Sequence, residues 1–299
     1  MDRPFTHQAA RASGLTPNDL TELVGSGVLR RPIRGVYVAA SVPDSTSLRL
    51  ACLRLVIPPD SVVCDRHAGW LHGAEMVLAP GEHLQAMPLT IFRTRGHDRL
   101  RNGLVDGGER TLLRSDVMEI EGVKVTTPLR TALDLGRVRW PERAIAALDA
   151  MLRLGVFDHD ELLGHVHRFS GARWVRTLRA VAPLADARSE SPGESVLRLK
   201  MVVRRIPVEP QVEVRDGTRF VARLDLAERE SQFGGEYDGE EWHTTPEQQA
   251  HDRSRRTDAD ELGWTIAVFR KENVFGPRAD VDRIATEAYR RARARRGLP

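Results

Sequence analysis

Three carboxylates and an imidazole gather within a short segment of the chain between residues 223 and 243. Asp225 lies in the apolar run RLDLA, and Glu236 and Asp238 end a second run. His243 follows four residues after Gly239. Because the two runs predict adjacent strands, these side chains should meet at one end of a small sheet. Carboxylates bind hard divalent cations, and a cation beside an imidazole has the groups needed for phosphodiester hydrolysis.

Each of these side chains has an expected role. Asp225 and Glu236 are candidate ligands of Mg²⁺ or Mn²⁺, because Mg²⁺ usually takes only one or two carboxylates from protein and keeps several waters. His243 is the candidate for proton transfer, since the pKa of an imidazole lies near neutrality. Asp238 is expected to orient His243 or to complete the outer shell of the metal.

Capping residues and turn residues predict the helices and strands that must position this site. Ser191 predicts an N-cap with Pro192 at the first helical position. VEPQVEV and RFVARLDLA flank Asp216-Gly217, which predicts a hairpin. SQFGGEYDG is the third expected strand, followed by a helix ending at Gly263 and by the strand WTIAVFR. The sequence therefore predicts a helix, three strands, a helix and a strand.

This order and its acidic strand ends resemble the PD-(D/E)XK nuclease superfamily, and within it the group related to the very-short-patch mismatch-repair endonuclease. The resemblance covers about residues 190–275 and implies a Mg²⁺-dependent endonuclease with an αβββαβ fold. The matching positions are Glu194, Asp225, Glu236, Asp238-Gly239, His243, and Asp252 with Arg255.

Four of these residues have structural alternatives or depart from the family pattern. Glu194 has capping-box spacing from Ser191, and Asp252 and Arg255 have the spacing of a surface ion pair. Superfamily members with the full motif place a lysine where this chain has Asp238. A nuclease fold that binds without cleaving therefore stays open as an interpretation.

Residues 4–40 predict two helices followed by a hairpin. Thr16 and Pro17 begin the second helix, Leu20, Leu23 and Val24 form its apolar stripe, and VLRRPIRGVYVA predicts two short strands. This is the layout of a winged helix-turn-helix, although a helical pair with a hairpin is also a common dimerisation unit. The candidate nucleic-acid contacts are Asn18, Thr21 and Glu22 on the recognition helix and Arg30, Arg31 and Arg34 on the wing.

The middle of the chain predicts further helices and strands, among them a helix over PLRTALDLG. This helix and the segment LVGSGVLRRPIRGVYV resemble the antitoxin family of the AbiE type IV toxin–antitoxin systems, over roughly residues 4–155. The resemblance implies promoter binding by the winged unit and a contribution of the following α/β domain to toxin neutralisation. Histidines 67, 72, 159, 165 and 167 lack zinc-site spacing and are expected at the surface or at helix caps.

Composition bounds the class of protein. The 299 residues are 41% hydrophobic and 29% charged, as in folded globular proteins, and no apolar run is long enough to span a membrane. Cys52 and Cys64 form no CxxC pair and the first residues lack a secretory signal, so a reducing cytoplasm is expected. The linker-like stretch ADARSESPGES supports three domains of mixed α/β class, at residues 1–43, 44–184 and 185–299.

These observations favour a DNA-binding protein with a Mg²⁺-dependent endonuclease module, for which double-stranded DNA is the expected partner. The alternative is a non-catalytic, antitoxin-like transcriptional autorepressor with a cognate toxin. A third interpretation is a scaffold whose modules bind only protein.

Overall fold

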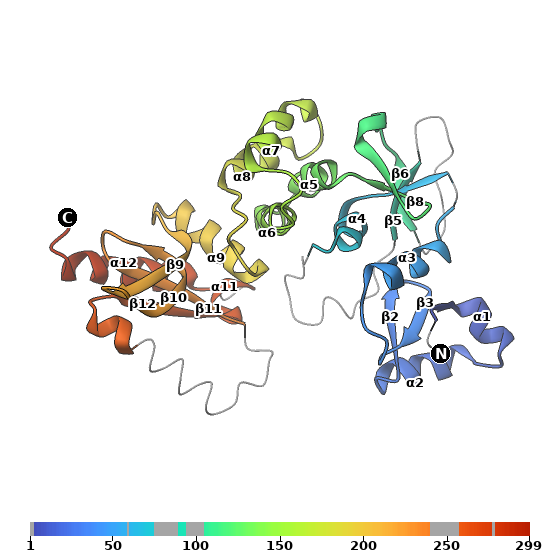
Figure 1. Ribbon diagram of the computed structural model, residues 1–299, viewed down its shortest axis with the longest axis horizontal. Coiled ribbons are helices and arrows are strands. Elements are labelled where there is room, and N and C mark those ends of the chain that lie inside the picture. The colour runs from blue at the N-terminus through green and yellow to red at the C-terminus, as the bar shows by residue number, and fades with distance from the viewer. Residues whose placement is uncertain (1–2, 59, 75–88, 94–104, 240–256, 277–278) are drawn as a thin grey trace. The chain divides into compact units, whose positions relative to one another are not determined.

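The computed structural model (Figure 1) describes all residues except 1–2, 59, 75–88, 94–104, 240–256 and 277–278. The chain is of mixed α/β class, as predicted, and forms two compact units, Met1–Leu135 and Gly136–Pro299. This division differs from the predicted boundaries at residues 43 and 184, which stay predictions. Among the helices that the structure describes, none has both the length and the apolar character of a bilayer span.

The first unit begins with the predicted helical pair and hairpin. Thr16 and Asp19 form a reciprocal capping box, in which the Thr16 Oγ1 accepts from the Asp19 N–H at 3.2 Å and an Asp19 carboxylate oxygen accepts from the Thr16 N–H at 2.7 Å. Leu20 is buried in a small core with Leu29 and Tyr37. An additional short strand extends the hairpin to a three-stranded sheet of order β1-β3-β2. The elements are β1 (Phe5–Thr6), α1 (His7–Ala12), α2 (Pro17–Gly25), β2 (Leu29–Ile33) and β3 (Val36–Ala39).

A five-stranded mixed sheet of order β6-β5-β4-β8-β7 forms the rest of the first unit. Ser45 caps the first helix after the wing, since its Oγ accepts from the Leu48 N–H at 3.1 Å. The apolar faces of α3 and α4 pack with the sheet around Leu53, Leu71 and Val125. The elements are α3 (Thr46–Arg54), β4 (Ser61–Val63), α4 (Asp65–His72), β5 (Leu89–Arg93), β6 (Val105–Glu109), η2 (Arg114–Asp116), β7 (Val117–Ile120), β8 (Val123–Thr126) and α5 (Pro128–Gly136).

The second unit begins with helices that pack on one another. The linker-like stretch of residues 185–195 packs against its neighbours and includes the start of α9 at Pro192. Ser189 is fully buried and its Oγ accepts from the Arg198 Nε at 3.2 Å, and Arg198 also pairs with buried Asp149 at 2.6 Å. This pair fastens α9 to α6. The elements are α6 (Pro141–Leu152), α7 (His159–His165), η3 (Val166–Phe169), α8 (Val175–Val181), η4 (Ala182–Leu184) and α9 (Pro192–Val203).

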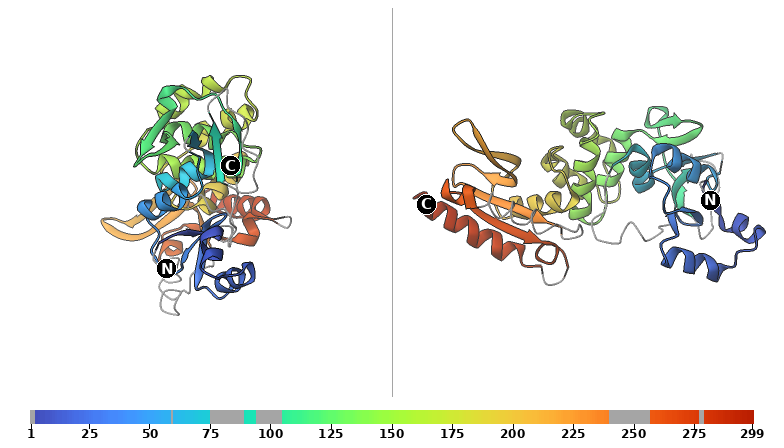
Figure 2. Two further views of the ribbon diagram at one scale, coloured as in Figure 1. Left: turned by 90° about the vertical axis from the view of Figure 1, so that its right-hand side faces the viewer. Right: turned by 60° about the horizontal axis from the view of Figure 1, so that its bottom comes forward.

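A four-stranded sheet of order β12-β11-β10-β9 follows. The first three strands in sequence are antiparallel, with a tight turn after Asp216 as predicted, and β12 returns parallel to β11. Helices α9 and α12 pack against this sheet (Figure 2). The elements are β9 (Glu209–Asp216), β10 (Arg219–Glu228), β11 (Phe233–Asp238), β12 (Thr265–Arg270), α11 (Lys271–Val274) and α12 (Val281–Arg295). The predicted helix before β12 is described only from residue 257 onward.

Candidate functional site

Two neighbouring strands of the second unit carry the predicted metal ligands. Asp225 lies on β10 and Glu236 on β11, and these strands pair antiparallel with Leu226 opposite Gly235. Asp225 and Glu236 follow directly at the end of this pairing, and they are close enough that the charge of Glu236 raises the pKa of Asp225. An Asp225 carboxylate oxygen accepts the Tyr237 N–H at 2.8 Å. The adjacency predicted for the two apolar runs is therefore confirmed.

Glu194 on α9 lies near Asp225, whose pKa its charge raises, and it is only 7% exposed. The Ser191 Oγ accepts the Glu194 N–H at 3.1 Å, so the predicted N-cap is confirmed. The Glu194 Oε2 accepts from the Glu190 N–H and from the Gln211 side-chain amide, both at 2.9 Å. Gln211 has a φ of 55°, which L residues rarely adopt, although it lies within strand β9. Glu194 thus supports the start of α9 and also contributes a carboxylate to the group.

The pKa of Asp225 reflects the carboxylates around it. Burial, together with the negative charges of Glu194, Glu236 and Glu190, raises this pKa to about 7, against the Tyr237 N–H, which lowers it. Burial also raises the pKa of Glu194. A buried carboxyl whose ionisation is opposed by other carboxylates is a site where positive charge would be favourable.

The donor set fits a cation held by two carboxylates and not by a larger cage. In the described part of the chain, no group of three or more histidine, cysteine, aspartate or glutamate side chains is arranged to hold a metal ion. Asp225 and Glu236 match the one or two carboxylates that Mg²⁺ usually takes from protein. His243, Asp252 and Arg255 lie outside the described residues.

Asp238, which occupies the place of the superfamily lysine, is the last residue of β11 and is half-buried. Its register partner on β12 is Arg270, and Lys271 follows directly at the start of α11. Two basic residues therefore lie next to the end of the strand that carries Asp238. The sequence alone did not indicate that Arg270 and Lys271 lie beside Asp238, because the parallel pairing of β11 and β12 joins segments about thirty residues apart.

The winged part of the first unit presents the predicted nucleic-acid contacts unequally. Asn18 and Thr21 are exposed on α2, and Arg34 is exposed in the turn between β2 and β3. Arg30 is half-buried and its guanidinium donates to the Val42 carbonyl at 2.9 Å.

The guanidinium of Arg31, by contrast, lies 5.5 Å from the centre of the Tyr37 ring, and this side chain is half-buried. Of the three arginines predicted for the wing, Arg34 is the one that is exposed.

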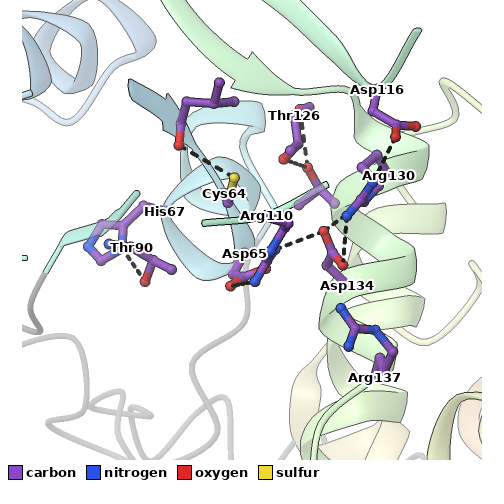
Figure 3. Close-up of polar contacts among 12 residues, drawn as sticks. Cys64, Asp65, His67, Thr90, Arg110, Asp116, Thr126, Arg130, Asp134 and Arg137 are labelled. Carbon is purple, nitrogen blue, oxygen red and sulfur yellow. Dashed lines mark hydrogen bonds and ion pairs between the residues drawn. The ribbon is translucent and has the colours of Figure 1, made fainter. Parts of the chain in front are cut away.

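Sequence reasoning missed a chain of buried ion pairs in the first unit (Figure 3). Arg110 binds Asp65 through two hydrogen bonds of 2.6 and 2.9 Å and reaches Asp134 at 2.9 Å. Arg130 also binds Asp134, at 2.8 Å, and it pairs with Asp116 at 2.7 Å. Arg130 and Asp134 belong to the segment TTPLRTALDLG. The signal that could have found them is a charged i, i+4 pair within an apolar helix.

His67, which lies beside this network, is buried, so the prediction that it has a surface or capping role is wrong. It is 7% exposed, and its Nδ1 accepts the Thr90 N–H at 3.1 Å. Burial lowers its pKa to about 4, so the ring is neutral in the folded protein. The ring nitrogens of His159, His165 and His167 instead contact backbone carbonyls at helix ends, as predicted.

Comparison with known proteins adds two findings. Residues 61–184 match the family model of the AbiEi antitoxin C-terminal domain. Two proteins of Mycobacterium tuberculosis, the uncharacterized proteins MT2308 of strain CDC 1551 / Oshkosh and Rv2248 of strain ATCC 25618 / H37Rv, are each 30% identical to this chain over 280 residues. Each alignment covers 92% of this chain and 97% of the mycobacterial protein.

Proposed function

We propose that this chain is an antitoxin-like DNA-binding regulator. The chain belongs to one family with these two mycobacterial proteins, and its residues 61–184 match the AbiEi antitoxin C-terminal domain. The observation that carries the proposal is the winged unit, which precedes the matched segment in the chain. Its helix α2 begins at a complete capping box and exposes Asn18 and Thr21. Polar side chains on an exposed recognition helix read base edges, while arginines on a wing contact phosphates.

The partner we propose is double-stranded DNA upstream of the protein's own coding region. Binding there would be salt-sensitive, because each phosphate contact releases counterions. Arg34 is the proposed phosphate contact on the wing, since Arg30 already donates to the Val42 carbonyl.

The test is fluorescence anisotropy with labelled upstream DNA and a scrambled duplex at several salt concentrations. We expect Asn18→Ala to reduce the preference for the upstream duplex, and Arg34→Ala to weaken binding to both duplexes and lower the salt slope by about 1. Arg54→Ala is the control, because Arg54 is exposed on α3 and pairs with Glu121. Wild-type protein that binds both duplexes equally would contradict the proposal.

A cognate toxin, encoded beside this chain, is the second partner we propose, and its basis is the AbiEi match. The test is to express the neighbouring gene alone and together with this chain and to measure growth. Growth arrest that this chain relieves supports the pairing. A neighbour that does not arrest growth, or an arrest that this chain does not relieve, contradicts it.

A second candidate function, metal-dependent phosphodiester hydrolysis, is favoured by one observation: Asp225 has a pKa of about 7 beside Glu194 and Glu236. Mg²⁺ bound there would stabilise charge on a scissile phosphate and activate water. Asp225 and Glu236 would hold the ion. The Tyr237 N–H fixes the orientation of the Asp225 carboxylate.

Calorimetric titration with Mg²⁺ and with Mn²⁺ tests this candidate without knowledge of the substrate. Binding by the wild type that Asp225→Asn abolishes supports it, and DNA nicking lost in the same variant extends it to hydrolysis. Cleavage that persists in both Asp225→Asn and Glu236→Gln would point to a contaminant. Absence of any binding heat at millimolar metal would end the proposal.

A further inference from the structure

Two arginine–tryptophan pairs lie exposed on the helices of the second unit. Trp140 precedes α6 and is 54% exposed, and Trp174 precedes α8 and is 39% exposed. The guanidinium of Arg139 lies 4.7 Å from the centre of the Trp140 ring, and that of Arg173 lies 5.1 Å from the Trp174 ring. Each pair thus presents a large aromatic ring and a cation together at the surface.

The two segments that carry these pairs pack against each other. The Arg137 Nη1 donates to the Arg173 carbonyl at 3.2 Å, and the Arg137 guanidinium lies 5.0 Å from the centre of the Phe169 ring. At Gly136, a Cβ would approach the Leu178 Cδ1 to 2.6 Å, so the chain entering α6 touches α8 directly. Helices α6 and α8 lie side by side (Figure 1). The two pairs therefore lie on segments that are in contact, and we call the exposed surface of these segments the Arg–Trp surface.

Positive charge dominates the Arg–Trp surface. Its two segments, residues 137–143 and 168–179, hold seven arginines and a single acid, Glu142. Five of the arginines are exposed. These exposed arginines are Arg139, Arg143, Arg173, Arg176 and Arg179.

Exposed aromatic rings among arginines have a specific use. A nucleobase stacks on a tryptophan ring whatever its sequence, and arginines between the rings attract the phosphates. In a duplex the bases are already stacked on one another, so a ring of this kind favours unpaired bases.

We propose that the Arg–Trp surface binds single-stranded nucleic acid, with Trp140 and Trp174 stacking on bases and the arginines of both segments contacting phosphates. The winged unit contributes no residue to this surface, and the carboxylates at Asp225 do not either. The site is therefore additional to both functions proposed above, and it can fail without affecting them.

The experiment measures binding of the full chain to fluorescently labelled dT20, U20 and a 20-base-pair duplex of random sequence, by anisotropy and by quenching of tryptophan fluorescence. We expect the wild type to prefer the single strands and to show quenching when they bind. The double variant Trp140→Leu/Trp174→Leu keeps apolar side chains but removes both rings. It should lose the quenching and bind dT20 at least about tenfold more weakly.

The variant Arg139→Glu/Arg173→Glu tests the charge, and it should also weaken binding of dT20 by at least about tenfold. Its matched control is Arg215→Glu/Arg219→Glu, which makes the same change of charge at exposed arginines of the β9–β10 hairpin and should bind as the wild type does. Circular dichroism melting curves check that every variant is folded.

Three results would overturn the proposal. The first is equal affinity of the wild type for the duplex and for both single strands. The second is full affinity for dT20 in the variant that lacks both tryptophan rings. The third is a loss in the arginine variant that the hairpin control shares, because this would reflect net charge alone.

Discussion

Arg130 and Asp134 lie one helical turn apart on α5 and are joined by a hydrogen bond of 2.8 Å from Nε to Oδ2, with side chains only 5% and 1% exposed. Asp134 also accepts from Arg110, and Arg130 also pairs with Asp116. The pair therefore links α5 to two segments that lie earlier in the sequence. A buried ion pair of this kind is costly to break, because each charge left behind has lost its hydration.

Arg130→Ala should lower the free energy of unfolding by about 3–5 kcal/mol, since it leaves the carboxylates of Asp116 and Asp134 without this partner. Urea denaturation followed by circular dichroism measures the change. Arg54→Ala is the comparison, because Arg54 pairs with Glu121 at an exposed position and should cost no more than about 1 kcal/mol. Equal losses of unfolding free energy in the two variants would show that burial of the ion-pair network adds nothing to stability.

His67 should make the folded protein sensitive to acid. Burial lowers its folded-state pKa to about 4 from the ordinary 6.5, so the unfolded chain binds a proton that the folded protein does not. The contribution of neutral His67 to the free energy of unfolding is therefore fully present above pH 6.5 and is lost as the pH falls toward 4. His67→Asn retains an acceptor for the Thr90 N–H and should remove this part of the pH dependence. The melting temperatures of both proteins at pH 7 and pH 4.5 provide the measurement, and parallel pH profiles would contradict the assignment.

Asp225 should have the opposite pH dependence. Its folded-state pKa is raised to about 7, so the folded protein holds a proton that the unfolded chain releases above about pH 4. Its contribution to stability is present in acid and is lost as the pH rises from 4 to 7. Asp225→Asn should thus be more stable than the wild type at pH 8 and equal to it near pH 4, when both are melted in a metal chelator. If Asp225→Asn were less stable than the wild type at pH 8, ionised Asp225 would not be unfavourable in the folded protein.

Gly193 should tolerate no larger residue. A Cβ at this position would lie 2.1 Å from the Tyr237 Cε1, so Gly193→Ala must displace the Tyr237 ring. The backbone N–H of the same tyrosine binds the Asp225 carboxylate. We expect a loss of about 1–3 kcal/mol in chemical denaturation. Gly164→Ala is the control, because Gly164 lies within α7 with no atom near the added methyl group and should be neutral or slightly stabilising. A stable Gly193→Ala variant would contradict the close approach.

Local chemistry in the sequence determined many elements of both units. Thr16 and Ser191 each accept a backbone N–H three residues later, and Gly217 takes a φ of 59° in the predicted hairpin turn. These interactions join residues close in sequence, so the residue types alone predict them. The pairing of β10 with β11 was also predictable, since only four residues separate the two strands.

Tertiary structure alone decided what surrounds those elements. The distance in sequence from Asp65 to Arg110, or from Arg137 to the Arg173 carbonyl, leaves no local pattern to read. The burial of His67, the contact of Gly193 with Tyr237 and the grouping of Glu194 with Asp225 likewise arise only when separate segments pack. Cap and turn preferences act over a few residues, whereas desolvation and ion pairing depend on every element that closes around a group.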